Sequence, residues 1–265
     1  MTPVRFEKWE GLGNDFVVLR DIGRDLADAE VRALCDRRFG IGADGVLLVE
    51  TRGATPRMVV RNADGSRPEM CGNGLRCVVG HLAHLAAGGL LVVATDAGER
   101  ACRIVDAHDG TFEVEVDMGV ARTGPDLVAT VADGEHRFLT VDMGNPHAIT
   151  FEACDERDVD TIGPAVATLP AGGTNVEFCR EDRRGAEARI VVVVWERGVG
   201  RTLACGTGAC AVAVAACDTG RARFGEPVLV ALPGGELTIT VAAGTRAVRM
   251  RGPARQVFTG EVVIR

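Results

Sequence analysis

Two cysteines that each begin a glycine-rich segment are the residues whose type and spacing most suggest chemistry. Cys71 opens the run Cys-Gly-Asn-Gly, and Cys205 opens the run Cys-Gly-Thr-Gly. Each follows a strand-like run and precedes small or apolar residues that are typical of a helix. Because N–H groups and the dipole at a helix start favour negative charge, we expect both thiols to have a pKa below the ordinary value of about 8.5. One such thiol would be a candidate nucleophile, whereas two in matching contexts indicate a pair.

A thiolate and a thiol on opposite sides of one carbon acid could invert its configuration. The thiolate would take the α-proton from one face, and the thiol would return a proton to the other face. The helix starts would donate N–H groups to a carboxylate and stabilise the enolate-like charge that develops as the proton leaves. General acid–base catalysis works best when the catalytic pKa lies near the working pH. The cysteine pair therefore predicts two-base inversion of a stereocentre without a cofactor.

The residues around the two cysteines are also duplicated. The residue nine positions before the cysteine is Asn62 in the first half and Glu196 in the second half. Further upstream, each half carries a Gly-Asn pair, at 13–14 and at 144–145. The period is about half the chain, which is too long for a solenoid repeat. We predict two copies of one domain that face each other across a cleft and bind different ends of one substrate.

The order of strand-like and helical runs predicts the α+β class with largely antiparallel sheets. Most segments alternate apolar and polar residues as strands do, with Gly and Pro turns between them. Asp28 is expected to cap the first helix. The run 209–217 is almost wholly Ala, Val and Cys, and its place in the repeat favours a helix. The four helices are expected at 28–38, 75–87, 159–169 and 209–217.

Charge and hydropathy exclude several classes of function. The formal net charge is −7 and no basic cluster is present, which argues against a nucleic-acid partner. No run of 18 or more apolar residues occurs, so we expect no membrane span. The first residues include charged Arg5, Glu7 and Lys8 and no apolar signal core, and we expect a cytoplasmic protein.

The lysine and cysteine content bears on cofactors. Lys8 is the only lysine, and it lies in the first strand-like run, so pyridoxal phosphate with its Schiff-base lysine is not expected. The nine cysteines do not form the Cys-x-x-Cys pairs of zinc sites, so we expect no metal. An odd cysteine count without a secretory signal indicates reduced thiols.

Seven motifs spread along the whole chain resemble those of the diaminopimelate epimerase family and stand in that family's order. They are Gly-Leu-Gly-Asn-Asp-Phe (11–16), Asn-Ala-Asp-Gly-Ser (62–66), Met-Cys-Gly-Asn-Gly-Leu-Arg-Cys (70–77), Met-Gly-Asn-Pro-His (143–147), Thr-Asn-Val-Glu-Phe (174–178), Trp-Glu-Arg-Gly (195–198) and Ala-Cys-Gly-Thr-Gly-Ala-Cys (204–210). The resemblance implies interconversion of LL- and meso-2,6-diaminopimelate, a step toward lysine and peptidoglycan precursors, without pyridoxal phosphate or metal.

The resemblance also implies roles for individual residues. Cys71 and Cys205 would be the two bases, and His147 and Glu196 would bracket them. Glu196 would also take the α-ammonium group. The reacting carboxylate would be bound at the two helix starts, by Gly72, Asn73, Gly206 and Thr207. The ammonium and distal carboxylate would be held by Asn14, Asn62, Asn145, Asn175 and Arg197, the last of which can pair with a carboxylate through two hydrogen bonds.

The fold that the resemblance implies is a pair of pseudo-symmetric domains with the active site in the cleft between them. Each would be a mostly antiparallel sheet or barrel wrapped around its central helix. We expect the first domain at 1–118 together with the final strand at 254–265, and the second at 119–253. Two positions depart from the family pattern: Gly45 stands where Gln is frequent, and Thr207 replaces a frequent Ser while keeping the hydroxyl.

Other interpretations remain open. A racemase of proline, hydroxyproline or a basic amino acid, or a related isomerase, would use the same cysteine pair. Arg197 and the asparagines favour a substrate with a second zwitterionic end. A binding protein or redox sensor, with a disulfide between Cys71 and Cys205, belongs to a different class. The family makes a homodimer plausible, although no interface pattern in the sequence argues for one.

Overall fold

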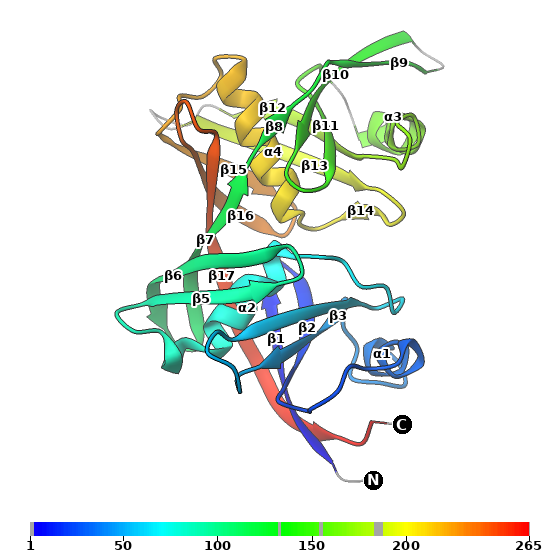
Figure 1. Ribbon diagram of the computed structural model, residues 1–265. Coiled ribbons are helices and arrows are strands. Elements are labelled where there is room, and N and C mark those ends of the chain that lie inside the picture. Colours follow the sequence, from blue (N-terminus) through cyan, green and yellow to red (C-terminus); the bar gives the residue numbers. More distant parts are fainter. Residues whose placement is uncertain (1–2, 132–133, 154–155, 183–187, 265) are drawn as a thin grey trace. The chain divides into compact units, whose positions relative to one another are not determined.

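The computed structural model describes residues 3–131, 134–153, 156–182 and 188–264. The chain divides into two compact units (Figure 1). Unit 1 comprises Met1–Val116 and Gly252–Arg265, and unit 2 comprises Asp117–Arg251. Both combine helices with sheets whose strands pair mainly antiparallel, which confirms the predicted α+β class. Among the described residues, no helix combines the length and apolar character that a membrane span needs.

Unit 1 is built from strands around one buried helix. Its elements are β1 (Val4–Gly11), β2 (Asn14–Arg20), α1 (Asp28–Cys35), β3 (Gly45–Glu50), β4 (Arg57–Asn62), α2 (Gly72–His81), the 3-10 turn η1 (Ala83–Leu85), β5 (Leu90–Thr95), β6 (Gly98–His108) and β7 (Thr111–Val120). Helix α2 contacts β1, β2, β3, β4 and β6, and its residues from Gly72 to Gly80 are all buried. It is therefore the central helix of this unit.

Unit 2 repeats this plan. Its elements are β8 (Arg122–Thr123), β9 (Leu127–Val131), β10 (Gly134–Asp142), β11 (Pro146–Thr150), α3 (Glu156–Ala167), β12 (Asn175–Glu181), β13 (Ala188–Glu196), β14 (Gly200–Thr202), α4 (Gly206–Asp218), β15 (Pro227–Leu232) and β16 (Gly235–Val241). The Ala-, Val- and Cys-rich run is helical, as predicted, and α4 contacts β10, β11, β12, β15 and β16. Its small side chains suit a helix that strands approach on several sides.

The two units also share strand pairings at equivalent positions. In unit 1, β2 runs parallel to β3, with Phe16 opposite Gly45. In unit 2, β11 runs parallel to β12, with His147 opposite Asn175. The other strands next to these pair antiparallel: β1 with β2, β3 with β4, β10 with β11, and β12 with β13. The predicted internal duplication therefore reaches the level of strand register.

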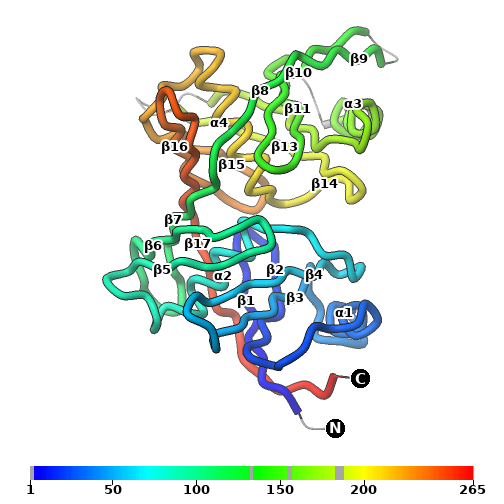
Figure 2. Tube along the Cα trace, in the orientation of Figure 1, coloured from blue at the N-terminus to red at the C-terminus, as the bar shows by residue number. Residues whose placement is uncertain are grey.

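The final strand, β17 (Ala247–Val262), passes from unit 2 into unit 1. Its first part pairs with β16, from Val248 opposite Val241 to Arg251 opposite Thr238. Its last part pairs antiparallel with β1, from Arg255 opposite Glu10 to Val262 opposite Val4. Figure 2 shows this end of the chain (red) beside the first strand (blue) in unit 1.

The first helix is shorter than predicted, and its cap is different. The prediction was a helix over 28–38 capped by Asp28, but α1 ends at Cys35 and its N-cap is Ala27. The Glu30 side chain accepts from the Ala27 N–H at 2.8 Å, while the Asp28 carboxylate pairs with Arg61. Beyond the helix, the Asp36 side chain accepts from the N–H groups of residues 38 and 39 and so forms a turn. The second helix also ends earlier than predicted, at His81.

Gly80 lets α2 lie against the aromatic side chains of unit 1. A Cβ at this position would lie 2.6 Å from Cζ3 of Trp9 and 3.1 Å from Cδ2 of Phe112. Trp9 is buried, so its ring has little room to move. We expect Gly80→Ala to lower the free energy of unfolding by about 1–2 kcal/mol, because the clash exceeds the gain in helix propensity. Urea unfolding measures the change, and in a Trp9→Phe background, which lacks the clashing atoms, the loss should be smaller. An unchanged unfolding midpoint in the single variant would contradict the predicted clash.

Candidate active site

Cys71 is the N-cap residue of α2. Its backbone is extended, with φ −137° and ψ 114°, and its side chain is half-buried. The Gly74 N–H donates to Cys71 Sγ at 3.4 Å. Ser, Thr, Asp and Asn are the residues preferred in this position, where a side-chain oxygen accepts the hydrogen bond, so the thiol takes the place of an ordinary cap. The sulfur therefore lies directly at the positive end of the helix dipole.

Cys205 occupies the same position at the start of α4. Its φ of −123° and ψ of 108° are close to those of its counterpart in unit 1. The Gly208 N–H donates to Cys205 Sγ at 3.3 Å, and Thr207 Oγ1 lies 3.6 Å from the same sulfur. The side chain is buried. Each unit thus presents one sulfur in the same local geometry.

The residues predicted to bind the reacting carboxylate form the first turns of these helices. Gly72 and Asn73 are the first two residues of α2, and Gly206 and Thr207 are the first two residues of α4. N–H groups in a first helical turn have no acceptor within the helix. Such groups form anion sites when they point to an accessible position. Both helix starts therefore combine a thiol with N–H donors suited to a carboxylate.

The surroundings of Cys205 correct one prediction from the sequence. Burial raises the pKa of the Cys205 thiol well above its ordinary value, and the charges of Glu196 and Glu177 raise it further. The hydrogen bonds from Thr207 and from the Gly208 N–H act in the opposite direction but are weaker. The predicted lowering of the pKa is therefore wrong for Cys205 in this structure. Its desolvation and two nearby carboxylates outweigh the helix start, and the resting form at neutral pH is the thiol.

Two predicted binding residues of unit 1 are in direct contact. Asn14, the first residue of β2, accepts a hydrogen bond from Asn73 Nδ2 at 3.3 Å through its Oδ1. Its Nδ2 donates to Asp44 Oδ2 at 2.8 Å. Asn62, the last residue of β4, instead donates to Ser66 Oγ at 2.9 Å within the loop that leads to α2. Asn14 and Asn73 therefore form one cluster at the start of α2.

Asp44 is a residue that the sequence analysis missed. Its carboxylate accepts from the Asn14 side chain and, at 3.1 Å, from the Asp15 N–H. Arg37 pairs with this carboxylate at 2.8 Å and with the Asp15 carboxylate at 2.7 Å. The only sequence signal was its place in a Gly-rich loop that precedes a strand. Asp44 fixes the orientation of the Asn14 amide.

The structure gives a physical reason for Gly45. It pairs with Asn62 across β3 and β4, and a Cβ at this position would lie 2.7 Å from the backbone oxygen of Arg61. The approach of β4 therefore leaves no room for a side chain. The Gln that is frequent here in the resembling family could not be accommodated without moving the strand.

In unit 2, Asn145 and His147 join a buried carboxylate. His147, in β11, is fully buried, and its Nδ1 lies 2.6 Å from Oε1 of Glu177 in β12. The other ring nitrogen, Nε2, lies 3.2 Å from Asn145 Oδ1. Glu177 belongs to the Thr-Asn-Val-Glu-Phe motif, but the sequence analysis gave it no role. The structure thus brings two predicted site residues, Asn145 and His147, into direct contact and adds a third, Glu177, that was overlooked.

The remaining predicted residues of unit 2 lie at the ends of β12 and β13. Asn175 begins β12, and its Oδ1 accepts from the Arg197 N–H at 3.0 Å. Glu196 ends β13, and its Oε1 accepts from Thr202 Oγ1 at 2.6 Å. The Arg197 side chain is exposed, and its guanidinium donates to the carbonyl oxygens of Gly172 and Gly173. Asn175 therefore fixes the backbone beside Glu196.

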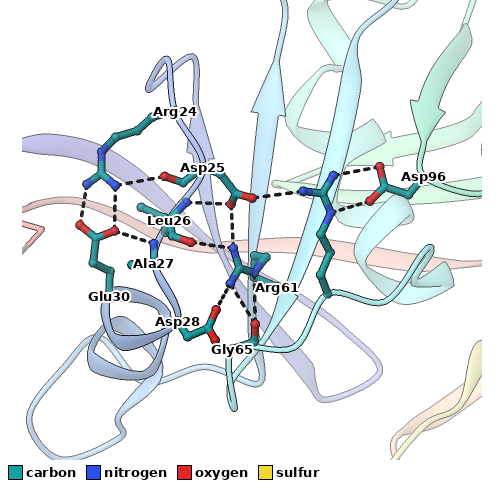
Figure 3. A network of polar contacts seen from close by, with 10 residues as sticks. Arg24, Asp25, Leu26, Ala27, Asp28, Glu30, Arg61, Gly65 and Asp96 are labelled. Carbon is teal, nitrogen blue, oxygen red and sulfur yellow. Dashed lines mark hydrogen bonds and ion pairs between the residues drawn. The ribbon is translucent and has the colours of Figure 1, made fainter.

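A second polar network in unit 1 includes Arg61 of β4, which precedes the predicted site residue Asn62 (Figure 3). It includes Arg24, Asp25, Arg61 and Asp96, and it borders a hollow of about 310 Å³. Arg24 pairs with Glu30 at 2.6 Å, and Arg61 pairs with Asp25 at 2.8 Å. Arg24 and Arg61 of this network therefore both have carboxylate partners. Because Arg61 of β4 also pairs with Asp28, the first residue of α1, the network joins these two elements. In the described part of the chain, no group of three or more His, Cys, Asp or Glu side chains is arranged to hold a metal ion.

Comparison with known proteins identifies relatives along the whole chain. The family model described as diaminopimelate epimerase matches residues 6–124 and 139–257. A diaminopimelate epimerase of Desulforudis audaxviator is 44% identical over 283 aligned positions, which cover 98% of this chain and 99% of the relative. A diaminopimelate epimerase of a Synechococcus strain is 41% identical and covers 98% of this chain and 99% of the relative.

Solved structures share the fold at lower identity. A protein of Pseudomonas aeruginosa described as a predicted epimerase is 20% identical, with a TM-score of 0.74 over 98% of this chain and 99% of that one. A hydroxyproline epimerase of Agrobacterium vitis, solved with trans-4-hydroxy-L-proline, is 18% identical, with a TM-score of 0.71 over 99% of this chain and 91% of that one. These likenesses concern the two-domain α+β fold.

Proposed function

This chain belongs to the diaminopimelate epimerase family, and on that premise we propose that Cys71 and Cys205 are the two bases that invert its substrate. The enzyme is an isomerase that interconverts LL- and meso-2,6-diaminopimelate. The observation that carries the assignment of the bases is their shared geometry: each sulfur caps a buried central helix and accepts from the third N–H of that helix. The reaction requires that both sulfurs reach the same α-carbon.

The protonation state of Cys205 supports a direction for the first step. Its raised pKa leaves Cys205 protonated in the resting enzyme and suited to donate a proton. We assign the removal of the α-proton in this first step to Cys71. The electron pair of the C–H bond moves into the carboxylate as an enolate-like anion. Cys205 then gives its proton to the opposite face of the carbon, and the two thiols have exchanged roles. A substrate of the opposite configuration reacts with this second form.

The helix starts stabilise the intermediate anion. The N–H groups of Gly72, Asn73, Gly206 and Thr207 donate to the reacting carboxylate, whose negative charge increases as the proton leaves. Because these donors are fixed by the helices, they need no rearrangement during the reaction. In racemases that use pyridoxal phosphate, the cofactor stabilises the carbanion by accepting its electrons. Here the N–H groups stabilise the anion instead.

The polar side chains around the cysteines hold the rest of the substrate. We assign the α-ammonium to Glu196, and the distal ammonium and carboxylate to Asn14, Asn62, Asn145, Asn175 and Arg197. Arg197 is exposed and donates to backbone carbonyls of residues 172 and 173, so its guanidinium can exchange these acceptors for a carboxylate. His147 supports the same site from within unit 2.

Proton exchange in deuterated water tests the proposal. Incubation of the purified enzyme with LL- or meso-diaminopimelate should replace the α-proton by deuterium as the stereocentre inverts, and NMR and mass spectrometry measure both events. A panel that includes proline, hydroxyproline and lysine should show little exchange, because these substrates lack the second zwitterionic end. Exchange on proline but not on diaminopimelate would contradict the assignment of substrate.

Two further properties belong to the proposal. The substrate is a small metabolite, and we expect the enzyme to work in the cytoplasm as part of the synthesis of lysine and peptidoglycan precursors. A homodimer remains a prediction, which light scattering on the purified protein can test directly.

A further inference from the structure

The residue nine positions before each cysteine begins a turn of the same kind in both units. The carbonyl oxygen of Asn62 accepts from the Gly65 N–H at 2.8 Å, and the carbonyl oxygen of Glu196 accepts from the Val199 N–H at 3.1 Å. Each bond joins residues three positions apart, as in a β-turn, and each turn follows directly after a strand, β4 or β13. The chain therefore reverses at equivalent places before it reaches each cysteine.

Each turn brings a hydroxyl group back to the side chain at its start. Ser66 Oγ accepts from Asn62 Nδ2 at 2.9 Å, and Thr202 Oγ1 donates to Glu196 Oε1 at 2.6 Å. Thr202 belongs to β14, which pairs antiparallel with β13 so that Gly200 lies opposite Glu196. Both units thus hold the side chain at this position with a hydroxyl from the segment that leads to the cysteine.

The contact in unit 2 is the stronger of the two. A hydrogen bond to a carboxylate is roughly twice as strong as one between neutral groups. Glu196 and Thr202 are both half-buried, whereas Asn62 and Ser66 are exposed, so water competes more effectively for the contact in unit 1. The charge of Glu196 also raises the pKa of the Cys205 thiol. The position of this carboxylate therefore affects the thiol as well as any ammonium group that the carboxylate binds.

The strand itself does not require a hydroxyl group at this position. Thr202 lies opposite Val194 across β14 and β13. Valine has nearly the same volume as threonine and a similar preference for strands, so it would suit this place in the hairpin equally well. Packing and strand propensity therefore do not explain the hydroxyl group, whereas its contact with Glu196 does.

We propose that Thr202 is a positioning residue that acts through Glu196 and fixes the carboxylate that takes the α-ammonium group of the substrate. Ser66 has the corresponding role for Asn62, which we assign to the distal end. The inference rests on the proposed function, because that function supplies the ammonium group. Without the hydroxyl donor, the Glu196 side chain gains rotamer freedom, and the α-carbon is held in a less defined position beside the thiol of unit 2.

Kinetics of two variants test the proposal. Thr202→Val keeps the size of the side chain and removes the donor, so kcat/KM for diaminopimelate should fall about 10- to 100-fold, the scale of a hydrogen bond to a charged group. Both kcat and KM should change, because Glu196 acts on Cys205 and also holds the ammonium group. Thr202→Ser keeps the hydroxyl and should retain most of the wild-type activity. In a Glu196→Ala background, Thr202→Val should add little, because the partner is already absent.

Ser66→Ala is the corresponding change in unit 1. It should raise KM about 2- to 10-fold, the scale of a hydrogen bond between neutral groups, with little change in kcat, because Asn62 holds the distal end. The matched control is Thr219→Val, which removes a hydrogen bond of 2.7 Å from Thr219 Oγ1 to the Ala215 carbonyl oxygen at the far end of α4. This variant should keep the wild-type kcat and KM. Wild-type kinetics in a folded Thr202→Val protein would overturn the proposal.

Crystal structures of the two Thr202 variants give a readout that does not depend on activity. In Thr202→Ser, the Glu196 carboxylate should keep its wild-type position and accept from the new hydroxyl group. In Thr202→Val, the carboxylate should turn to another rotamer. An unchanged Glu196 in Thr202→Val would overturn the inference even if the enzyme epimerises diaminopimelate. Failure of the wild-type protein to epimerise diaminopimelate, with Glu196 displaced in Thr202→Val, would contradict the proposed function instead.

Discussion

Replacement of either Cys71 or Cys205 by serine is expected to lower epimerisation about 10²- to 10⁴-fold, the range that one general acid or base contributes. Serine is a preferred N-cap residue and can accept the same N–H hydrogen bond as the sulfur does, at Gly74 or at Gly208. The helix start should therefore remain intact. The hydroxyl ionises far less readily than a thiol, so the variant loses the proton transfer and keeps the fold.

The alanine variants separate the two roles of each sulfur. Cys71→Ala and Cys205→Ala should be as inactive as the serine variants and should also lose about 1 kcal/mol of stability, because the cap is removed. Solvent deuterium entering the α-carbon, followed separately from each stereoisomer, measures the loss at each base. The control is Cys217→Ala at the opposite end of α4, where burial raises the thiol pKa to about 11. Full turnover in either serine variant would contradict a two-base mechanism.

Gly208→Ala is expected to lower kcat about 100-fold, the loss that a misplacement of roughly 1 Å at the reacting atoms produces. The added methyl group would lie 2.7 Å from Glu177 Oε1 and 3.2 Å from Cys205 Sγ, so either the carboxylate or the thiol must move. Alanine favours a helix over glycine by up to about 1 kcal/mol, which offsets part of the strain. We therefore expect a large loss of activity with little change in stability.

Gly80→Ala on the other central helix is expected to give the opposite result, a loss of stability without a loss of kcat. Its methyl group meets the buried Trp9 and the half-buried Phe112, neither of which belongs to the candidate site. That variant should unfold more easily and keep its kcat when measured at a temperature where it is folded. Steady-state kinetics and thermal unfolding of both variants give the comparison. A destabilised Gly208→Ala protein with normal kcat would show that Gly208 serves packing only.

Sequence patterns could predict the scaffold of the site because local rules determine it. A cysteine before Gly-x-Gly, after a strand and before an apolar run, is an N-cap in both units, at Cys71 and at Cys205. The equal spacing to Asn62 and Glu196 likewise reflects strands that end at equivalent places, β4 and β13. These features depend on short stretches of chain, and the sequence contains them twice.

The role of Glu177 could not be predicted from alternation. In Asn-Val-Glu-Phe, a strand with one buried face would place Val176 and Phe178 inside and Glu177 in solvent. Strand β12 instead contacts α3 and α4, and residues 175–179 are all buried. A strand covered on both faces gives no alternation to interpret. The partner of Glu177 also comes from β11, which is 30 residues away in sequence.

The prediction of a lowered pKa for Cys205 was wrong for a related reason. The helix start is a local feature and argues for a low pKa, but burial and the charges of Glu177 and Glu196 come from tertiary structure. Desolvation of a thiolate is the largest of these effects, and no sequence window contains it. The same limit applies to Gly45, whose lack of a side chain follows from the approach of Arg61 on the neighbouring strand.

The path of β17 has a consequence for how the chain is made. The ribosome produces β1 early, but the residues that pair with it, 255–262, emerge only after all of unit 2, which is a continuous segment from Asp117 to Arg251. Until then, one edge of β1 lacks its neighbour and can recruit another strand. Unit 2 can therefore fold during translation, whereas the sheet of unit 1 closes after its synthesis. Pairing across so long a sequence separation is slow, and we expect nascent unit 1 to be the part of the protein that chaperones protect.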